Sequence, residues 1–299
     1  MLQLNGIMPP LTTPFDAAGN LALALLSDNV ERYNETGLAG YVALGSNGEA
    51  VHLSADERVY VINTIKRAAT ENHKIIAGIN ELSTHAAIEA TQRAADAGAD
   101  VVLVVTPYFY KGAMTQTVLA AHFNRVSDAS PLPVLLYNVP QNTGVVLDPA
   151  TIAALAAHEN IIGLKDSSGN MAAMAETLRL VPADFNVFVG NGAILYPSLM
   201  MGAKGAVLAV ACAAPRACVE LFDAVQQDDY AKACDLQNRL APLSNIVTAG
   251  LGVTGLKAAL DLAGYAGGSP CAPLLPANDS EREKVKTVMQ NSGLFAAFA

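Results

Sequence analysis

Short apolar segments without polar alternation recur along the chain, separated by stretches with the periodicity of a helix. Such runs are typical of parallel strands that are covered on both faces. Most of them begin roughly 25 to 35 residues apart, which is the length of a strand, a helix and two short loops. We expect eight strands: Gly6–Leu11, Tyr41–Leu44, Lys74–Gly78, Asp100–Val105, Pro133–Tyr137, Ile161–Lys165, Asn186–Val189 and Lys204–Ala209.

Helix-start and helix-stop signals lie between these segments. Ser54, with Glu57 three residues later, opens one helical stretch, and Ser83-Thr84 precedes another over His85–Ala97. Gly98 then stands where a helix-terminating glycine is expected. Strands and helices are therefore predicted to alternate.

Eight strand–helix units close most economically into an α/β fold, the (β/α)₈ TIM barrel, which we assign to residues 1–225. Residues 226–299 are expected to form a helical C-terminal extension, because their amphipathic helices need a surface to cover. A doubly wound sheet is the alternative, but no GxGxxG follows the first predicted strand. The extension is predicted to contain helices near Asp228–Thr248, Gly252–Ala263 and Ser280–Asn291, with the turn-rich segment Gly264–Pro276 before the last.

Composition narrows the class of protein. The 299 residues are 52% hydrophobic and 15% charged, which suits a compact globule. A net charge of −9 with scattered lysines and arginines argues against a nucleic-acid partner, and four cysteines are too few for a disulfide scaffold. Since neither a leader peptide nor an apolar stretch of membrane-spanning length is recognised, we expect a cytoplasmic protein without a membrane partner.

Lys165 is the first candidate for chemistry, because it ends the apolar run Ile161–Leu164. Active sites of such barrels lie at the carboxyl ends of the strands. An ammonium is costly to desolvate there, and desolvation favours the neutral amine, which can attack a carbonyl carbon. A structural lysine paired with a neighbouring strand end is the alternative.

Tyr137 ends the strand before that of Lys165. Side chains from adjacent strands emerge about 5 Å apart, so the phenol could exchange protons with a nascent imine. The alternative is a strand-end tyrosine that caps the core with its hydroxyl in water.

The loop Gly45-Ser46-Asn47-Gly48-Glu49 follows the second predicted strand. Its glycines allow backbone N–H groups to turn toward one anion, although a plain turn is the commoner meaning of such a loop. The five histidines are isolated, so neither a metal nor a zinc-dependent aldolase mechanism is expected, and no GxSxG indicates a hydrolase.

Four motifs in this order and spacing resemble the dihydrodipicolinate synthase and N-acetylneuraminate lyase superfamily. They are Gly45-Ser46-Asn47-Gly48-Glu49, Thr106-Pro107-Tyr108, Tyr137-Asn138-Val139-Pro140 and Gly163-Leu164-Lys165-Asp166. The resemblance implies the barrel with its helical extension, a homotetramer or homodimer, and pyruvate chemistry with no metal or organic cofactor.

The same resemblance assigns roles residue by residue. Lys165 matches the Schiff-base lysine and Tyr137 the proton-shuttling tyrosine. Ser46 and Asn47 match the pair that holds the pyruvyl carboxylate, and Gly190 a backbone contact after the seventh strand. Further substrate contacts are expected from Gly48, Tyr108, Asn142 and Lys111.

Two positions depart from the synthases of this superfamily. Asn142 stands where they carry an arginine for the carboxylate of the aldehyde, which argues against the lysine-pathway reaction. Phe109 stands where they lend a tyrosine across a subunit interface, and Tyr108 or Tyr110 is the substitute available nearby. Three segments resemble 4-hydroxy-2-oxoglutarate and 2-keto-3-deoxy-aldonate aldolases more than they resemble the synthases. They are the loop after the second predicted strand, Asn142-Thr143-Gly144 and Gly267–Cys271.

The sequence thus favours a lyase that cleaves a 4-hydroxy-2-oxo acid, with 4-hydroxy-2-oxoglutarate as first choice, to pyruvate and an aldehyde such as glyoxylate. Lys111 is the nearest cation for a second carboxylate, unless it is a solvated loop lysine. The runner-up is a 2-keto-3-deoxy-sugar-acid aldolase or dehydratase, in which Gln141, Asn142 and Asn191 would meet hydroxyls. A non-catalytic pyruvate-binding protein is the rival of another class.

Overall fold

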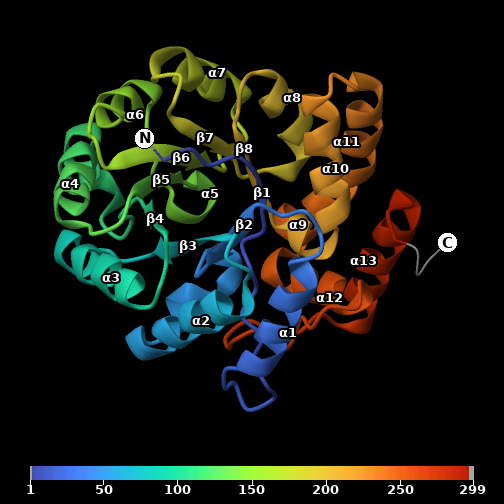
Figure 1. The fold of residues 1–299 in the computed structure, drawn as a ribbon. Helices are drawn as coiled ribbons and strands as arrows, with labels where there is room; N and C mark the ends of the chain where they lie inside the picture. Colours follow the sequence, from blue (N-terminus) through green and yellow to red (C-terminus); the bar gives the residue numbers. More distant parts are fainter. Residues whose placement is uncertain (1, 296–299) are drawn as a thin grey trace.

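The computed structural model describes residues 2–295, and within them eight parallel strands form a closed barrel surrounded by helices (Figure 1). Neighbouring strands pair in the order β1-β8-β7-β6-β5-β4-β3-β2. The barrel closes between β1 and β2, where the Leu11 N–H donates to the Val42 carbonyl at 2.9 Å and the Val42 N–H to the Pro9 carbonyl at 3.0 Å. The strands are β1 (Gly6–Met8), β2 (Gly40–Ala43), β3 (Lys74–Ile79), β4 (Val101–Val105), β5 (Val134–Asn138), β6 (Ile161–Asp166), β7 (Asn186–Val189) and β8 (Gly205–Val207).

Each strand overlaps one of the predicted apolar segments, so the predicted TIM barrel is confirmed. The first strand is shorter than predicted because Pro9 and Pro10 carry no N–H to continue its ladder. The last is also shorter, since Leu208 lies between β8 and a short helix rather than in the strand. β5 and β6 each continue one residue further than predicted.

The helices of the barrel begin at the predicted caps. The Ser54 hydroxyl accepts from the Glu57 N–H while the Glu57 carboxylate accepts from the Ser54 N–H, and Ser83 caps the next helix. The helices are α1 (Leu23–Tyr33), α2 (Ala55–Ala68), α3 (Thr84–Asp96), α4 (Gln116–Ala129), α5 (Pro140–Thr143), α6 (Pro149–Leu155), α7 (Met171–Leu180), α8 (Leu195–Met200), α9 (Val210–Ala213) and α10 (Pro215–Gln226).

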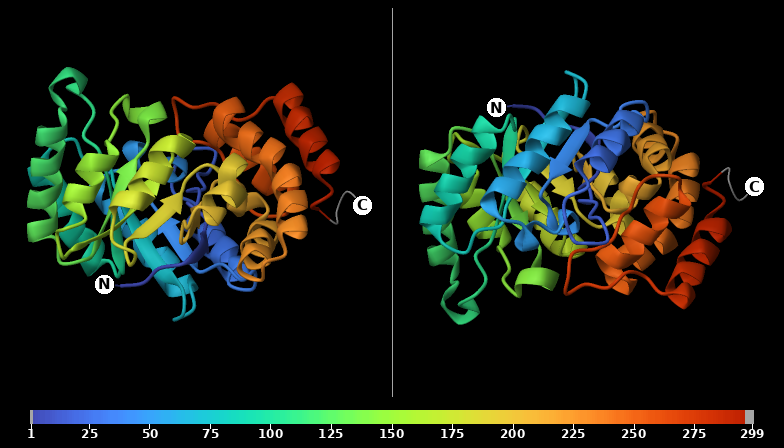
Figure 2. Two further views of the ribbon diagram at one scale, coloured as in Figure 1. Left: turned by 90° about the horizontal axis from the view of Figure 1, so that it is seen from above. Right: turned by 90° about the horizontal axis from the view of Figure 1, so that it is seen from below.

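Three further helices cover one side of the barrel, as both views in Figure 2 show. They are α11 (Tyr230–Asn245), α12 (Gly252–Leu262) and α13 (Asp279–Ser292). The α-helix predicted to reach Thr248 ends at Asn245 and continues as a π-helical turn over Ile246–Gly250, in which the Leu251 N–H donates to the Ile246 carbonyl. Such wide turns concentrate at functional sites.

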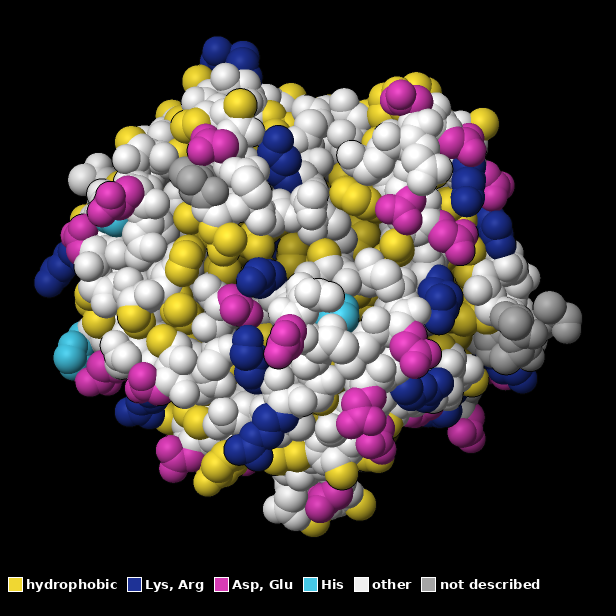
Figure 3. All heavy atoms as spheres, viewed as in Figure 1, with side chains coloured by type: hydrophobic (Ala, Val, Ile, Leu, Met, Phe, Trp, Pro, Cys, Tyr) yellow, Lys and Arg dark blue, Asp and Glu magenta, His cyan; other side chains and the backbone are white. Residues whose placement is uncertain are grey.

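Two separate hydrophobic clusters account for the core. One fills the inside of the barrel with residues such as Met8, Ile76, Leu135 and Phe188, and the other lies between the strands and the helices. No helix among the described residues is long and apolar enough to cross a bilayer. On the face seen in Figure 3, basic and acidic side chains are interspersed rather than gathered by sign.

Candidate active site

The direction in which Lys165 points depends on an irregularity in β6. Val134 pairs with Ile161 but Leu135 pairs with Gly163, so Ile162 is an extra residue on this strand. Strict alternation from Ile161, which packs outside the barrel, would also turn Lys165 outward. Because the extra residue reverses the alternation, Leu164 faces out and Lys165 faces the barrel interior.

Lys165 and Tyr137 lie directly opposite each other on β6 and β5. The Lys165 Nζ is 4.2 Å from the centroid of the Tyr137 ring, and the two residues are 3% and 4% exposed. Burial by itself raises the pKa of the Tyr137 phenol. The Lys165 charge and the side-chain hydrogen bonds with Ser46, Lys165 and Ser167 outweigh it, so that this pKa lies below its usual value. The phenol is thus more acidic than that of an isolated tyrosine.

Ser46 reaches this pair from the opposite side of the barrel mouth. The loop after β2 forms a short 3₁₀ turn over Ser46–Gly48, and the Ser46 Oγ lies 3.4 Å from the Tyr137 hydroxyl. The adjacent Asn47 side chain borders the same cavity. Two neighbouring strands and one loop distant from them in sequence therefore bring an amine, a phenol and a hydroxyl together.

These residues line one cavity of about 320 Å³, which is sufficient for a small 2-oxo acid. Lys165 is the one charged side chain among the described residues that line it. The others are neutral: Pro10, Ser46, Asn47, Tyr137, Val139, Gln141, Asn142, Ser167, Gly190, Asn191, Val207, Ala209, Thr248, Ala249, Gly252 and Val253.

Gly190 and Asn142, two of the predicted substrate contacts, lie on this cavity. The Gly190 N–H donates to the Asp166 carbonyl at 2.7 Å, and a Cβ at this position would collide with the Ser167 side chain. Gly48 is buried directly behind the cavity wall, where its carbonyl accepts from the Thr13 hydroxyl at 2.8 Å and its N–H donates to the Gly45 carbonyl at 2.9 Å.

The structure places the remaining predicted contacts further away. Tyr108 is half-buried against the cluster between strands and helices, and Lys111 is exposed with its ammonium close to Gly144. Phe109 and Tyr110 are 70% and 72% exposed, and their rings meet edge to face at 5.1 Å. None of these four is among the described residues that line the cavity.

Sequence reasoning missed the contribution of the C-terminal extension. Thr248 and Ala249 in the π-helical turn, together with Gly252 and Val253 at the start of α12, form one wall of the cavity. The paired glycines at 250 and 252 were a signal that this helical stretch is interrupted.

Ser167 was also missed, and it follows strand β6. The loop that carries it is held by Asp166, whose carboxylate accepts from the Asn138 amide and the Ser168 hydroxyl, both at 2.8 Å. The Gln141 amide donates to the Ser167 carbonyl at 2.8 Å. These bonds fix the loops after β5 and β6 relative to each other.

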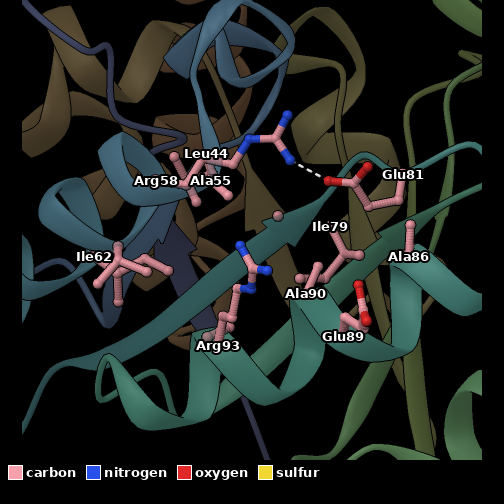
Figure 4. A pocket seen from close by; sticks show the side chains of 13 residues that line it. Leu44, Ala55, Arg58, Ile62, Ile79, Glu81, Ala86, Glu89, Ala90 and Arg93 are labelled. Carbon is pink, nitrogen blue, oxygen red and sulfur yellow. Dashed lines mark hydrogen bonds and ion pairs between the residues drawn. The ribbon is translucent and has the colours of Figure 1, made fainter.

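A second cavity lies outside the barrel between α2 and α3 (Figure 4). Arg58 forms an ion pair with Glu81 across it, while Arg93 and Glu89 extend from α3. It contains none of the predicted site residues. Within residues 2–295, no three His, Cys, Asp or Glu side chains are grouped so that they could hold a metal ion.

Comparison with known proteins identifies the family of this chain. The model of the dihydrodipicolinate synthetase family matches residues 3–292. The 4-hydroxy-tetrahydrodipicolinate synthase of Exiguobacterium sp. is 36% identical over 288 residues, which cover 96% of this chain and 98% of that protein. The 4-hydroxy-tetrahydrodipicolinate synthase of Ruegeria pomeroyi is 36% identical over 292 residues, which cover 98% and 100%.

Solved structures with the same fold extend the likeness. Dihydrodipicolinate synthase from Thermotoga maritima matches with a TM-score of 0.93 and 30% identity over 98% of this chain and 100% of that chain. YagE, a prophage protein of this synthase family from E. coli K12 in complex with pyruvate, matches with a TM-score of 0.91 and 30% identity over 97% and 99%. The chain therefore belongs to the dihydrodipicolinate synthetase family and is an enzyme of the pyruvate-dependent lyase type.

Proposed function

We propose that this enzyme is a class I aldolase that cleaves 4-hydroxy-2-oxo acids through a Schiff base on Lys165. The observation that carries the proposal is the buried pair of Lys165 and Tyr137, whose amine and ring face each other at 4.2 Å within the cavity. An amine in an enclosed cavity, next to a phenol whose pKa is lowered, is suited to attack a carbonyl and to exchange protons.

In the cleavage direction, the Lys165 amine attacks the C2 carbonyl carbon. Tyr137 then gives its phenolic proton to the carbinolamine hydroxyl, which departs as water and leaves an iminium and a Tyr137 phenolate. Tyr137 takes the proton of the C4 hydroxyl, the C3–C4 bond breaks, and its electron pair moves toward the iminium nitrogen to give an enamine. The aldehyde departs. Protonation of the enamine at C3 and hydrolysis of the imine then release pyruvate and restore Lys165. Ser46, at 3.4 Å from the Tyr137 hydroxyl, relays the phenolic proton.

The C1 carboxylate is assigned to the loop that contains Ser46 and Asn47. Both residues border the same cavity as Lys165. Backbone N–H groups of such a tight turn, together with a hydroxyl and an amide, can hold a carboxylate without a cation. The groups assigned to the carboxylate are thus neutral. The positive charge of Lys165 remains next to the C2 carbon, where the reaction takes place.

The aldehyde half distinguishes two substrates. With 4-hydroxy-2-oxoglutarate it is glyoxylate, whose carboxylate would need Lys111 to move toward the cavity or neutral donors to replace a cation. A 2-keto-3-deoxy sugar acid releases an uncharged hydroxylated aldehyde instead. The second candidate is favoured by the cavity wall itself, where Gln141, Asn142 and Asn191 offer amides and no second charged side chain is found among the described residues.

Self-association forms part of the proposal. Four large apolar side chains are exposed on loops that follow three neighbouring strands, with 59% for Val51, 45% for Leu82, 70% for Phe109 and 72% for Tyr110. Exposed apolar side chains that gather on one region mark contact surfaces. We therefore propose that this region, the 51/82/109/110 surface, joins two copies of the chain.

Borohydride reduction in the presence of pyruvate tests the imine. The expected result is a peptide containing Lys165 that gains the mass of the reduced pyruvyl adduct, while Lys165→Ala gains none. Adduct on another lysine of the folded protein, or no adduct, overturns the proposal. Cleavage rates on 4-hydroxy-2-oxoglutarate and on 2-keto-3-deoxy sugar acids then choose between the substrates, with formation of 4-hydroxy-tetrahydrodipicolinate as a third assay. An adduct without turnover on any of them would indicate a pyruvate-binding protein.

A further inference from the structure

A second buried lysine lies behind the active-site loop. Lys257 on α12 and Glu49 at the end of the loop form an ion pair at 2.6 Å, and their side chains are 3% and 1% exposed. Neither is among the described residues that line the cavity. Burying both charges is costly, so this pair needs an explanation that the aldol chemistry does not supply.

The ammonium of Lys257 has a partner for each of its three hydrogens. Besides the Glu49 carboxylate, it donates to the Thr13 carbonyl at 2.8 Å and to the Ser269 carbonyl at 2.7 Å. The other Glu49 oxygen accepts from the Cys271 N–H at 2.7 Å. Four segments that are distant in sequence therefore meet at one buried pair.

Glu49 also determines the path of the loop. It adopts a left-handed backbone conformation with φ 55° and ψ 31° between the 3₁₀ turns Ser46–Gly48 and Ala50–His52. That conformation is strained for a residue with a side chain and persists where its surroundings hold it. The bonds to Lys257 and Cys271 hold the side chain, and the Thr13 hydroxyl holds the Gly48 carbonyl at 2.8 Å.

Lys257 connects the same loop with another wall of the cavity. It lies on α12, whose first residues Gly252 and Val253 border the cavity. The two walls that enclose a bound 2-oxo acid are thus fixed to each other through Glu49 and Lys257.

We propose that Glu49 and Lys257 are positioning residues that set the geometry of the carboxylate-binding turn at Ser46 and Asn47. The inference rests on the proposed function, because it concerns the site of the pyruvyl carboxylate. It separates two tasks of the loop: Ser46 and Asn47 contact the substrate, while Glu49 points backward and anchors the loop to the C-terminal extension.

The test measures how the rate of adduct formation on Lys165 depends on pyruvate concentration, in the full-length protein with borohydride. Lys257→Met leaves Glu49 buried without its cation, and the half-saturating pyruvate concentration is expected to rise about tenfold or more, as a small misplacement of a binding group would cause. The limiting rate at saturating pyruvate is expected to change less than about threefold, since Lys165 and Tyr137 stay in place.

Further variants separate positioning from stability. Glu49→Gln retains the shape of the side chain without its charge and is expected to raise the half-saturating pyruvate concentration as well. Lys257→Arg keeps the positive charge, so its half-saturating concentration is expected to lie between those of the wild type and Lys257→Met. Arg282→Met is the matched control: it breaks the exposed ion pair between Arg282 on α13 and Asp261 on α12, the helix that carries Lys257, and should leave both constants unchanged. Circular dichroism shows which variants are folded.

An unchanged half-saturating pyruvate concentration in folded Glu49→Gln or Lys257→Met protein overturns the inference. So does a fall in the limiting rate by the same factor as the half-saturating concentration rises. Wild-type protein that forms no adduct on Lys165 overturns the proposed function instead, and the inference with it. A Lys257→Met chain that does not fold leaves the decision to Glu49→Gln.

Discussion

At the scale of single residues, the proposed chemistry depends on one phenol next to one amine. Tyr137 is buried, its ring lies 4.2 Å from the Lys165 Nζ, and its hydroxyl lies 3.4 Å from the Ser46 Oγ. The positive charge of Lys165 helps to lower the phenol pKa, whereas burial alone would raise it. A single substitution of Tyr137 is therefore the most direct way to remove the proposed proton transfer.

Tyr137→Phe should lower kcat by about 10²–10⁴-fold, because it removes the general acid and base but keeps the ring next to Lys165. Borohydride should still label Lys165 in the presence of pyruvate, although more slowly. Steady-state kinetics with a 4-hydroxy-2-oxo acid measures the first effect. Tyr60→Phe, at an exposed position on α2, is the control. Wild-type kcat in the Tyr137→Phe enzyme would contradict the assigned role.

At the scale of elements, the extra residue in β6 decides which side chains face the cavity. Gly163 lies directly after the irregularity and packs closely on its neighbours. A Cβ at this position would meet the Asn186 carbonyl and come within 2.7 Å of the Leu135 side chain. The absence of a side chain at residue 163 is what allows the strand to shift by one residue without losing contact with β5 and β7.

Gly163→Ala should therefore destabilise the protein by about 1–3 kcal/mol, as overpacking of a close-packed interior does. It should also slow adduct formation at Lys165, because the strand has to move to admit the methyl group. Urea unfolding measures the first effect and borohydride trapping the second. Gly112→Ala provides the comparison, since nothing lies within 4 Å of its Cβ position, and should change neither. Equal stability of the two variants would refute the argument.

At the scale of the whole molecule, the 51/82/109/110 surface presents apolar side chains that the monomer leaves uncovered. Phe109 and Tyr110 project into solvent although their rings contact each other at 5.1 Å. Covering these two rings is favourable because it removes apolar surface from water. A partner copy seated on these loops would bury them near the mouth of the barrel.

The double variant Phe109→Ser/Tyr110→Ser should shift the protein toward a smaller assembly, because it removes the two largest apolar side chains of this surface. Light scattering coupled to size-exclusion chromatography measures the mass at equal concentration. Leu180→Ser, at another partly exposed apolar position on α7, is the control and should keep the wild-type mass. An unchanged mass of the double variant would contradict the proposed contact surface.

The sequence by itself determined the elements and where the candidate catalytic residues lie along the chain. Apolar runs, helix caps and turn glycines act over a few neighbouring residues, so the eight strands and the caps at Ser54 and Ser83 could be predicted without knowing the packing. The placement of Lys165 and Tyr137 at the ends of adjacent strands followed from the same local signals.

Tertiary structure alone decided how these residues meet. The inward direction of Lys165 depends on the register between β5 and β6, which is a property of two strands and not of either sequence. The cavity wall at Thr248 and Gly252, and the buried contact of Lys257 with Glu49, join segments about 200 residues apart. Local periodicity contains no information about such contacts, because they arise only when the barrel closes and the extension packs against it.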